Sequence, residues 1–144
     1  MKEYPNLIEL DDIWSHFEGF PLAHVATIDG DQPRVRSMAL IAYNKELWLA
    51  TKTAWDKVIQ IETNNRIEFI VEVRTEKGNG TLRCTGTADF IKDEATRIQL
   101  ASEIPWFSSY WISPDDDNFT LIHLSLNLIR YDHPYDKMKY TVRL

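Results

Sequence analysis

Residues 33–57 read PRVRSMALIAYNKELWLATKTAWDK, and this stretch decides how the rest of the chain is interpreted. Residues 34–43 have the composition and pattern of a β-strand. The pair Asn44-Lys45 predicts a tight turn into a second strand over 46–51. Together with the strand expected before residue 30, these segments predict a three-strand antiparallel meander.

The end of the same stretch has the pattern of a helix start. Thr53 is followed by Asp56 at capping-box spacing, which predicts that Thr53 caps a helix of about two turns ending near Thr63. Val58 and Ile61 fall on one face of that helix. A free helix N-terminus beside hydroxyl and basic side chains suits an anion such as phosphate.

Strand periodicity assigns the basic side chains of this stretch to one face. Alternate residues of a strand face the same side, so Arg34, Arg36 and Met38 are expected to lie together. A phosphate at that end of the sheet would meet helix amides, hydroxyls, Lys57 and one arginine. A simpler interpretation stays open, because single basic residues on strands usually face solvent and a capping threonine needs no ligand.

The flanking segments predict more strands, with short helices between them. A helix capped by Asn6 precedes a strand over 22–28, which turns at Asp29-Gly30-Asp31 into the strand over 34–43. Later segments predict strands over 66–73, 81–91 and 140–144, a helix from Asp93 to about Glu103, and a long strand after 115–117 with Ile122, Leu124, Leu126 and Leu128 on one face. About six strands, mostly in hairpin order, predict a mainly-β α+β protein built as a small antiparallel barrel with helices at its rim.

Composition limits the classes of function. The 144 residues suit one domain spanning 1–144, and the net charge of −6 argues against nucleic acid or anionic membrane partners. Apolar runs are short and the start has no signal-peptide pattern, so we expect a cytoplasmic protein. Cys84 stands alone, and the four histidines are dispersed, so no disulfide or metal site is predicted. Nucleophile, phosphate-loop and dinucleotide motifs are missing from the sequence, and no catalytic residue is named.

Several short motifs over residues 20–92 occur in the order of a known family. They are Ala26-Thr27-Ile28-Asp29-Gly30, Pro33 followed by Arg36-Ser37-Met38, Leu49-Ala50-Thr51, Lys57, and Arg83 with Gly86. As a set they resemble the FMN-binding split-barrel superfamily, the pyridoxamine 5'-phosphate oxidase-like proteins, and especially their short general-stress-protein branch. Agreement in the final strands is weaker.

The resemblance implies a fold, a cofactor and an assembly. The fold would be a six-stranded antiparallel split β-barrel with Greek-key connections. Arg36 and Lys57 would reach the FMN phosphate, and the backbone at Ser37 and Met38 would run beside the flavin ring. The phosphate and ribityl end would be lined by Thr51, Lys52 and Thr53. The protein would be a homodimer with two flavins in the subunit interface.

Two departures from the family pattern bear on function. The chain has Trp55-Asp56-Lys57 where the oxidases typically have Ser-Arg-Lys, and the Asp56 carboxylate would oppose a phosphate unless it turns away. The oxidases' C-terminal substrate motif is not evident in residues 136–144. We therefore do not expect oxidation of pyridoxamine phosphate itself.

The sequence supports one main hypothesis and two alternatives. The main one is an FMN-dependent oxidoreductase that exchanges electrons or hydride with a small-molecule partner. The alternatives are a flavin- or haem-binding sensor without turnover, and a cofactor-free dimeric interaction module on the same fold. The aromatic segment 106–111 could lie over a flavin, but packing against a helix or a dimer partner is the preferred interpretation, and it is left out of the predicted site.

Overall fold

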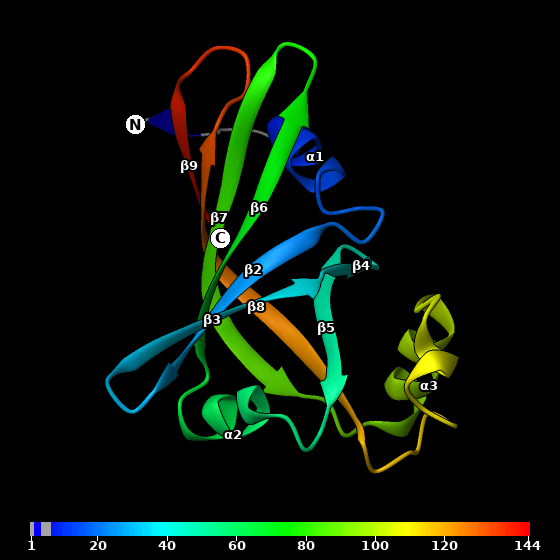
Figure 1. The fold of residues 1–144 in the computed structure, drawn as a ribbon. Coiled ribbons are helices and arrows are strands. Elements are labelled where there is room, and N and C mark those ends of the chain that lie inside the picture. The colour runs from blue at the N-terminus through cyan, green and yellow to red at the C-terminus, as the bar shows by residue number, and fades with distance from the viewer. Residues whose placement is uncertain (1, 4–6) are drawn as a thin grey trace.

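The computed structural model describes residues 2–3 and 7–144 and folds them around one β-sheet (Figure 1). The described elements are β1 (Lys2–Glu3), α1 (Leu7–Ser15), β2 (Leu22–Asp29), β3 (Gln32–Ala39), β4 (Ile41–Tyr43), β5 (Glu46–Lys52), α2 (Asp56–Thr63), β6 (Arg66–Thr75), β7 (Gly78–Phe90), α3 (Glu94–Glu103), the 3₁₀ turn η1 (Phe107–Ser109), β8 (Phe119–Asp132) and β9 (Lys139–Arg143). This is the predicted α+β split-barrel class. Its described part holds nine strands rather than about six, chiefly because of the short β1 and β4. None of the described helices has the length and apolar character needed to cross a membrane.

Strand β8 lies at the centre of the sheet. One of its edges pairs with β7, while the other edge pairs first with β5 and then with β9. The main path runs β1-β9-β8-β7-β6-β2-β3, and β4 joins through β5. Within the described sheet, β1 and β9 form a parallel pair and the remaining pairs are antiparallel.

Two clusters of buried side chains fill the two sides of this sheet. The first packs Ile13 of α1 and Phe17 against β2, β6 and β7. The second lies where α3 covers β4, β5 and the start of β8, with Leu100, Trp111 and Phe119 in its interior. Figure 1 places α1 and α3 beside different parts of the sheet, so each helix covers its own cluster.

Most local predictions are confirmed. The β2–β3 hairpin forms, and β6 buries Ile67, Phe69, Val71 and Val73 in strict alternation. Asp93 caps α3 by accepting a hydrogen bond from the Thr96 amide at 2.9 Å. The predicted Asn6 cap lies outside the described residues.

The predicted meander is wrong, because the strand over 34–43 breaks at Leu40. Strand β3 pairs with β2, whereas β4 pairs with β5 and β5 pairs with β8. Leu40 and Ile41 are both fully buried, but Leu40 belongs to the first cluster and Ile41 to the second. Two successive buried side chains cannot keep strand alternation on one face, so the chain bends from one cluster to the other.

The predicted apolar face of β8 is correct only as far as Leu126. The register against β7 shifts between Gly86, opposite Leu126, and Thr85, opposite Leu128, so Asn127 is an extra residue in the ladder. After this bulge the first cluster receives Ile129 and Tyr131 instead of Leu128. An inserted residue reverses which alternate side chains face the core.

Candidate functional site

A pocket of about 330 Å³ lies where β3, β5, the start of α2 and the aromatic segment meet. It therefore joins both halves of the 33–57 stretch to a segment distant in sequence. The lining residues are Ser37, Met38, Ala39, Ala50, Thr51, Trp55, Lys57, Trp106, Tyr110 and Trp111.

The start of α2 differs from the prediction. Trp55 occupies the N-cap position without a side-chain capping bond, and the helix begins at Asp56. The Thr53 hydroxyl instead donates to the Asp117 carbonyl at 2.8 Å and lies 2.7 Å from the Thr120 hydroxyl. These contacts tie Thr53 to the segment before β8, so it neither caps α2 nor lines the pocket.

Arg36 is held by a network of neutral acceptors. Its Nη1 donates to the Thr27 hydroxyl at 2.7 Å and to the Val25 carbonyl at 3.2 Å. Its Nη2 donates to Oε1 of Gln60, on α2, at 2.7 Å. The Thr27 hydroxyl in turn donates to the same Gln60 oxygen at 2.5 Å. Arg36 thus connects β3 to β2 and α2 while keeping its full positive charge.

Lys57 also contacts only neutral groups among its recorded partners. Its ammonium donates to the Thr51 hydroxyl at 3.2 Å and lies 4.4 Å from the centre of the Trp55 ring. Thr51 is 1% exposed, so the lysine reaches inward from the first turn of α2 toward the end of β5. Cation–π contact and one hydroxyl stabilise the ammonium without cancelling its charge.

Arg36 and Lys57 are here named the cation pair, and the one described carboxylate that acts on them, Asp56, forms no direct ion pair with either. No described side chain forms an ion pair with either residue. Burial lowers the pKa of Lys57, and the neighbouring Arg36 charge lowers it further. Burial also lowers the pKa of Arg36, an effect that the Asp56 charge opposes. Two partly buried positive charges that repel each other form a site that an anion would stabilise.

Four rings, here named the aromatic wall, line the pocket beside the cation pair: Trp55, Trp106, Tyr110 and Trp111. The Lys52 ammonium lies 5.8 Å from the Trp55 ring centre and 5.6 Å from that of Tyr110, at the pocket rim. Trp111 is also part of the second cluster, where its indole donates to the Asn118 carbonyl at 2.7 Å. The aromatic segment therefore packs the core, as preferred from the sequence, and also borders the pocket.

The structure brings most of the predicted residues together. Ser37, Met38, Thr51 and Lys57 line the pocket, Arg36 acts on Lys57 from beside it, and Lys52 is at the rim. Sequence reasoning considered the 106–111 segment but left it out of the predicted site, and it missed Trp55 and Gln60 as parts of the site. Gln60 follows Lys57 by one helical turn, so i,i+3 spacing was the signal that could have placed it on the same side of α2.

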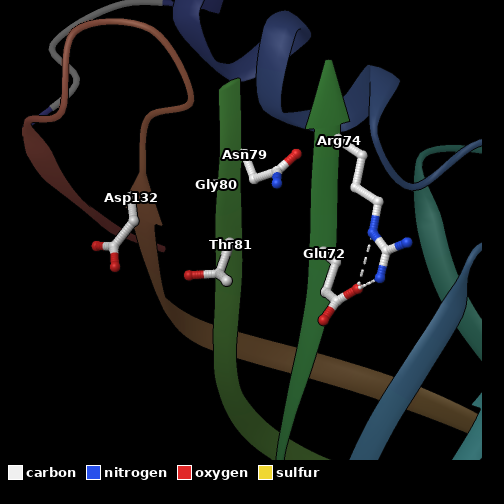
Figure 2. A pocket seen from close by; sticks show the side chains of 6 residues that line it. All are labelled: Glu72, Arg74, Asn79, Gly80, Thr81 and Asp132. Atoms are coloured by element: carbon white, nitrogen blue, oxygen red, sulfur yellow. Dashed lines mark hydrogen bonds and ion pairs between the residues drawn. The ribbon is translucent and has the colours of Figure 1, made fainter. Parts of the chain in front are cut away.

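A second surface pocket, of about 360 Å³, is a weaker candidate for a ligand site than the first (Figure 2). Glu72 and Arg74 on β6 pair with each other at 2.5 Å, and Asp132 of β8 pairs with Lys139 at 3.3 Å. Figure 2 shows Asn79, Gly80 and Thr81 between these two groups on β7. The charged side chains of this second pocket thus already have partners of opposite charge. Across the described side chains no cluster of metal-ligating groups occurs.

Comparison with known proteins identifies a family over most of the chain. The family model described as pyridoxamine 5'-phosphate oxidase matches residues 11–132, a range that contains the whole pocket. No curated protein matches the chain.

Solved structures share the fold at low sequence identity. General stress protein 26 from Bacillus anthracis str. Sterne is 19% identical, with a TM-score of 0.74 covering 93% of this chain and 97% of that one. A Clostridium acetobutylicum protein described as related to general stress protein 26 is 18% identical, with a TM-score of 0.77 and 96% of each chain covered. A heme binding protein from Mycobacterium smegmatis is 11% identical, with a TM-score of 0.71 covering 86% of this chain and 53% of that one.

Proposed function

Because the chain belongs to the pyridoxamine 5'-phosphate oxidase family, we propose that it binds FMN and uses it as an oxidoreductase with a small-molecule redox partner. The observation that carries the proposal is the cation pair, which forms no ion pair with a described carboxylate and lies beside the aromatic wall. FMN combines a phosphate dianion with a planar ring system, and these two features of the site match its two ends.

Each part of the site has a role in this proposal. Arg36 and Lys57 hold the phosphate through charge-assisted hydrogen bonds. The buried Thr51 hydroxyl fixes the Lys57 ammonium, and Lys52 adds positive charge at the rim. Ser37, Met38 and the aromatic wall line the same pocket and would hold the ring system. Thr53 is not needed, since its hydroxyl contacts Thr120 and Asp117 instead.

The cofactor, when bound, supplies the electron or hydride transfer, and the chain supplies binding and orientation. The pocket lining contains no histidine, cysteine or carboxylate. The protein's contribution is therefore to anchor the phosphate and to shield the ring system from water with aromatic side chains, while a donor such as a reduced nicotinamide supplies the electrons.

We also propose that the protein is a homodimer with the cofactor at the subunit interface. Strand β3 ends the main path of the sheet, and its Val35 is 71% exposed. Val35 and the pocket residue Ser37 are alternate residues of this strand, so they share a face. An exposed valine on an edge strand next to a pocket favours a partner that covers both.

Haem binding is the alternative with a specific observation behind it, because one structure of similar fold is a heme binding protein. Met38 and Tyr110 line the pocket and are side chains of types that ligate haem iron. FMN is preferred, since the cation pair suits a phosphate dianion and no histidine or cysteine, two common haem ligands, lines the pocket.

The direct test is FMN binding by the purified chain and by Lys57→Glu. We expect the wild-type protein to bind FMN with flavin absorption, and Lys57→Glu to weaken binding at least about tenfold, because a phosphate contact becomes repulsive. Lys92→Glu changes charge equally at an exposed position outside the pocket and serves as the control. A Soret band with added haem and no FMN binding would support the alternative.

Turnover separates an enzyme from a sensor. We expect the FMN-loaded protein to oxidise a reduced nicotinamide under steady-state conditions. Tight FMN binding without any turnover of nicotinamide or artificial electron donors would favour the sensor interpretation instead.

A further inference from the structure

The hydrogen bonds around Arg36 have one consistent direction. An arginine only donates, so the Thr27 hydroxyl must accept from it and direct its own proton elsewhere. That proton goes to Oε1 of Gln60, 2.5 Å away, which also accepts from Arg36 Nη2. Gln60 therefore presents its oxygen, not its amide nitrogen, to both groups, and its orientation is fixed by the chemistry of its partners.

The type of residue at position 60 matters for charge. Gln60 offers a neutral oxygen to a partly buried guanidinium, and the other recorded acceptors, Thr27 and the Val25 carbonyl, are neutral as well. A glutamate in this place would accept the same hydrogen bonds but would neutralise Arg36. The network thus fixes the guanidinium while leaving its charge available.

The recorded bonds also leave part of the guanidinium for a ligand. Nη1 uses its two N–H groups on Val25 and Thr27, and Nη2 uses one on Gln60. Neither Nε nor the other N–H of Nη2 has a recorded acceptor among the described residues. Two adjacent donors on one guanidinium are suited to two oxygens of one phosphate.

We propose that Gln60 is a positioning residue for phosphate recognition, which it serves by holding Arg36 through a neutral acceptor on α2. Lys57 lies on the same helix one turn earlier, so α2 sets the position of both members of the cation pair. The proposal rests on the proposed function, because the phosphate in question is that of FMN. It assigns Gln60 to the phosphate end of the ligand and not to the ring end.

The test compares FMN with riboflavin, which has the same ring and ribityl chain but no phosphate. In Gln60→Glu we expect FMN affinity to fall at least about tenfold while riboflavin affinity changes less than about twofold. A merely structural role would weaken both ligands alike. Gln99→Glu makes the same substitution at an exposed position of α3 and is expected to leave both affinities unchanged.

Gln60→Leu provides a second variant, which removes the acceptor without adding charge. It should also lower the ratio of riboflavin to FMN dissociation constants, and it keeps the proposal testable if Gln60→Glu does not fold. An unchanged ratio in the folded variants, with tight wild-type FMN binding, overturns the role of Gln60 alone. Failure of wild-type protein to bind FMN at all overturns the proposed function itself.

Discussion

Lys57 is the residue whose protonation controls the charge of the site. Its ammonium is half-buried between Thr51 and Trp55, and burial together with the Arg36 charge lowers its pKa below the ordinary 10.5. Between the lowered and the ordinary pKa the unfolded chain binds more protons than the folded one. Stability of the free protein should therefore rise with pH through this window as the penalty of the buried charge is lost.

FMN binding should show the opposite pH dependence. A bound phosphate dianion favours the charged amine, so we expect FMN affinity to fall as pH rises through the lowered pKa of Lys57, beginning below 10.5. Fluorescence titrations of FMN from pH 7 upward measure this directly. Riboflavin affinity should stay flat over the same range.

Lys57→Arg separates this residue from other titrating groups. Arginine stays charged across the range, so the variant should bind FMN with little pH dependence above neutrality. An undiminished fall in affinity in Lys57→Arg would assign the titration to another group and remove Lys57 from the phosphate contact.

Among the elements, the β7–β8 ladder carries the closest backbone approach near the core. A Cβ atom added to Gly86 would overlap the Ser125 carbonyl oxygen and would lie 2.9 Å from the Leu126 Cα. Both neighbours are backbone atoms in a paired strand, so they cannot move aside as a flexible side chain could. The bulge at Asn127 and Gly86, which pairs with the preceding residue Leu126, therefore depend on each other.

Gly86→Ala should lower the free energy of unfolding by about 2–4 kcal/mol, because overpacking here must displace the bulged strand. Urea denaturation followed by tryptophan fluorescence measures the loss. Gly30→Asn is the matched control: Gly30 has a φ of 64° and nothing within 4 Å of an added Cβ, and asparagine tolerates that backbone region. Equal stability of Gly86→Ala and wild type would show that the bulge adapts freely.

Elements were predictable where one face of a strand or helix is buried and the other is not. The alternation of β6 and the Asp93 cap of α3 are local patterns, and both are confirmed. The break at Leu40 was not predictable, because the apolar run 38–41 does not say that successive side chains enter different clusters. Thr53 failed as a cap because a distant segment supplies its hydroxyl partners.

The residues of the candidate site also divide into those with a local sequence signal and those without one. Arg36 and Lys57 could be named from a short stretch and a family resemblance, since their spacing is local. The aromatic wall depends on the 106–111 segment folding back over β5, and the acceptor role of Gln60 depends on how α2 packs on β2 and β3. Such tertiary placement has no signal in the spacing of a single segment.

For the molecule as a whole, the proposed dimer would cover the exposed side of β3. Light scattering should give the mass of a dimer for wild type, and Val35→Glu should shift it to the monomer and weaken FMN binding at least about tenfold. Val35 is 71% exposed, so folding of the separate chain should be little affected. Ile98→Glu, at a 51% exposed residue of α3 that does not line the pocket, is the control. A dimeric Val35→Glu with full affinity would place the interface elsewhere.

The pairing of β5 with β8 also governs how the chain can be made. Leu47 and Leu49 are buried in the folded chain, and the β8 residues that pair with them, Leu124 and Ile122, are synthesised much later. During translation the β4–β5 hairpin therefore lacks its β8 partner strand. Its apolar side chains and the unpaired edge of β5 can contact other chains in that period. The ladder that holds β5 in the finished protein therefore leaves an aggregation-prone strand edge on the nascent chain until late in its synthesis.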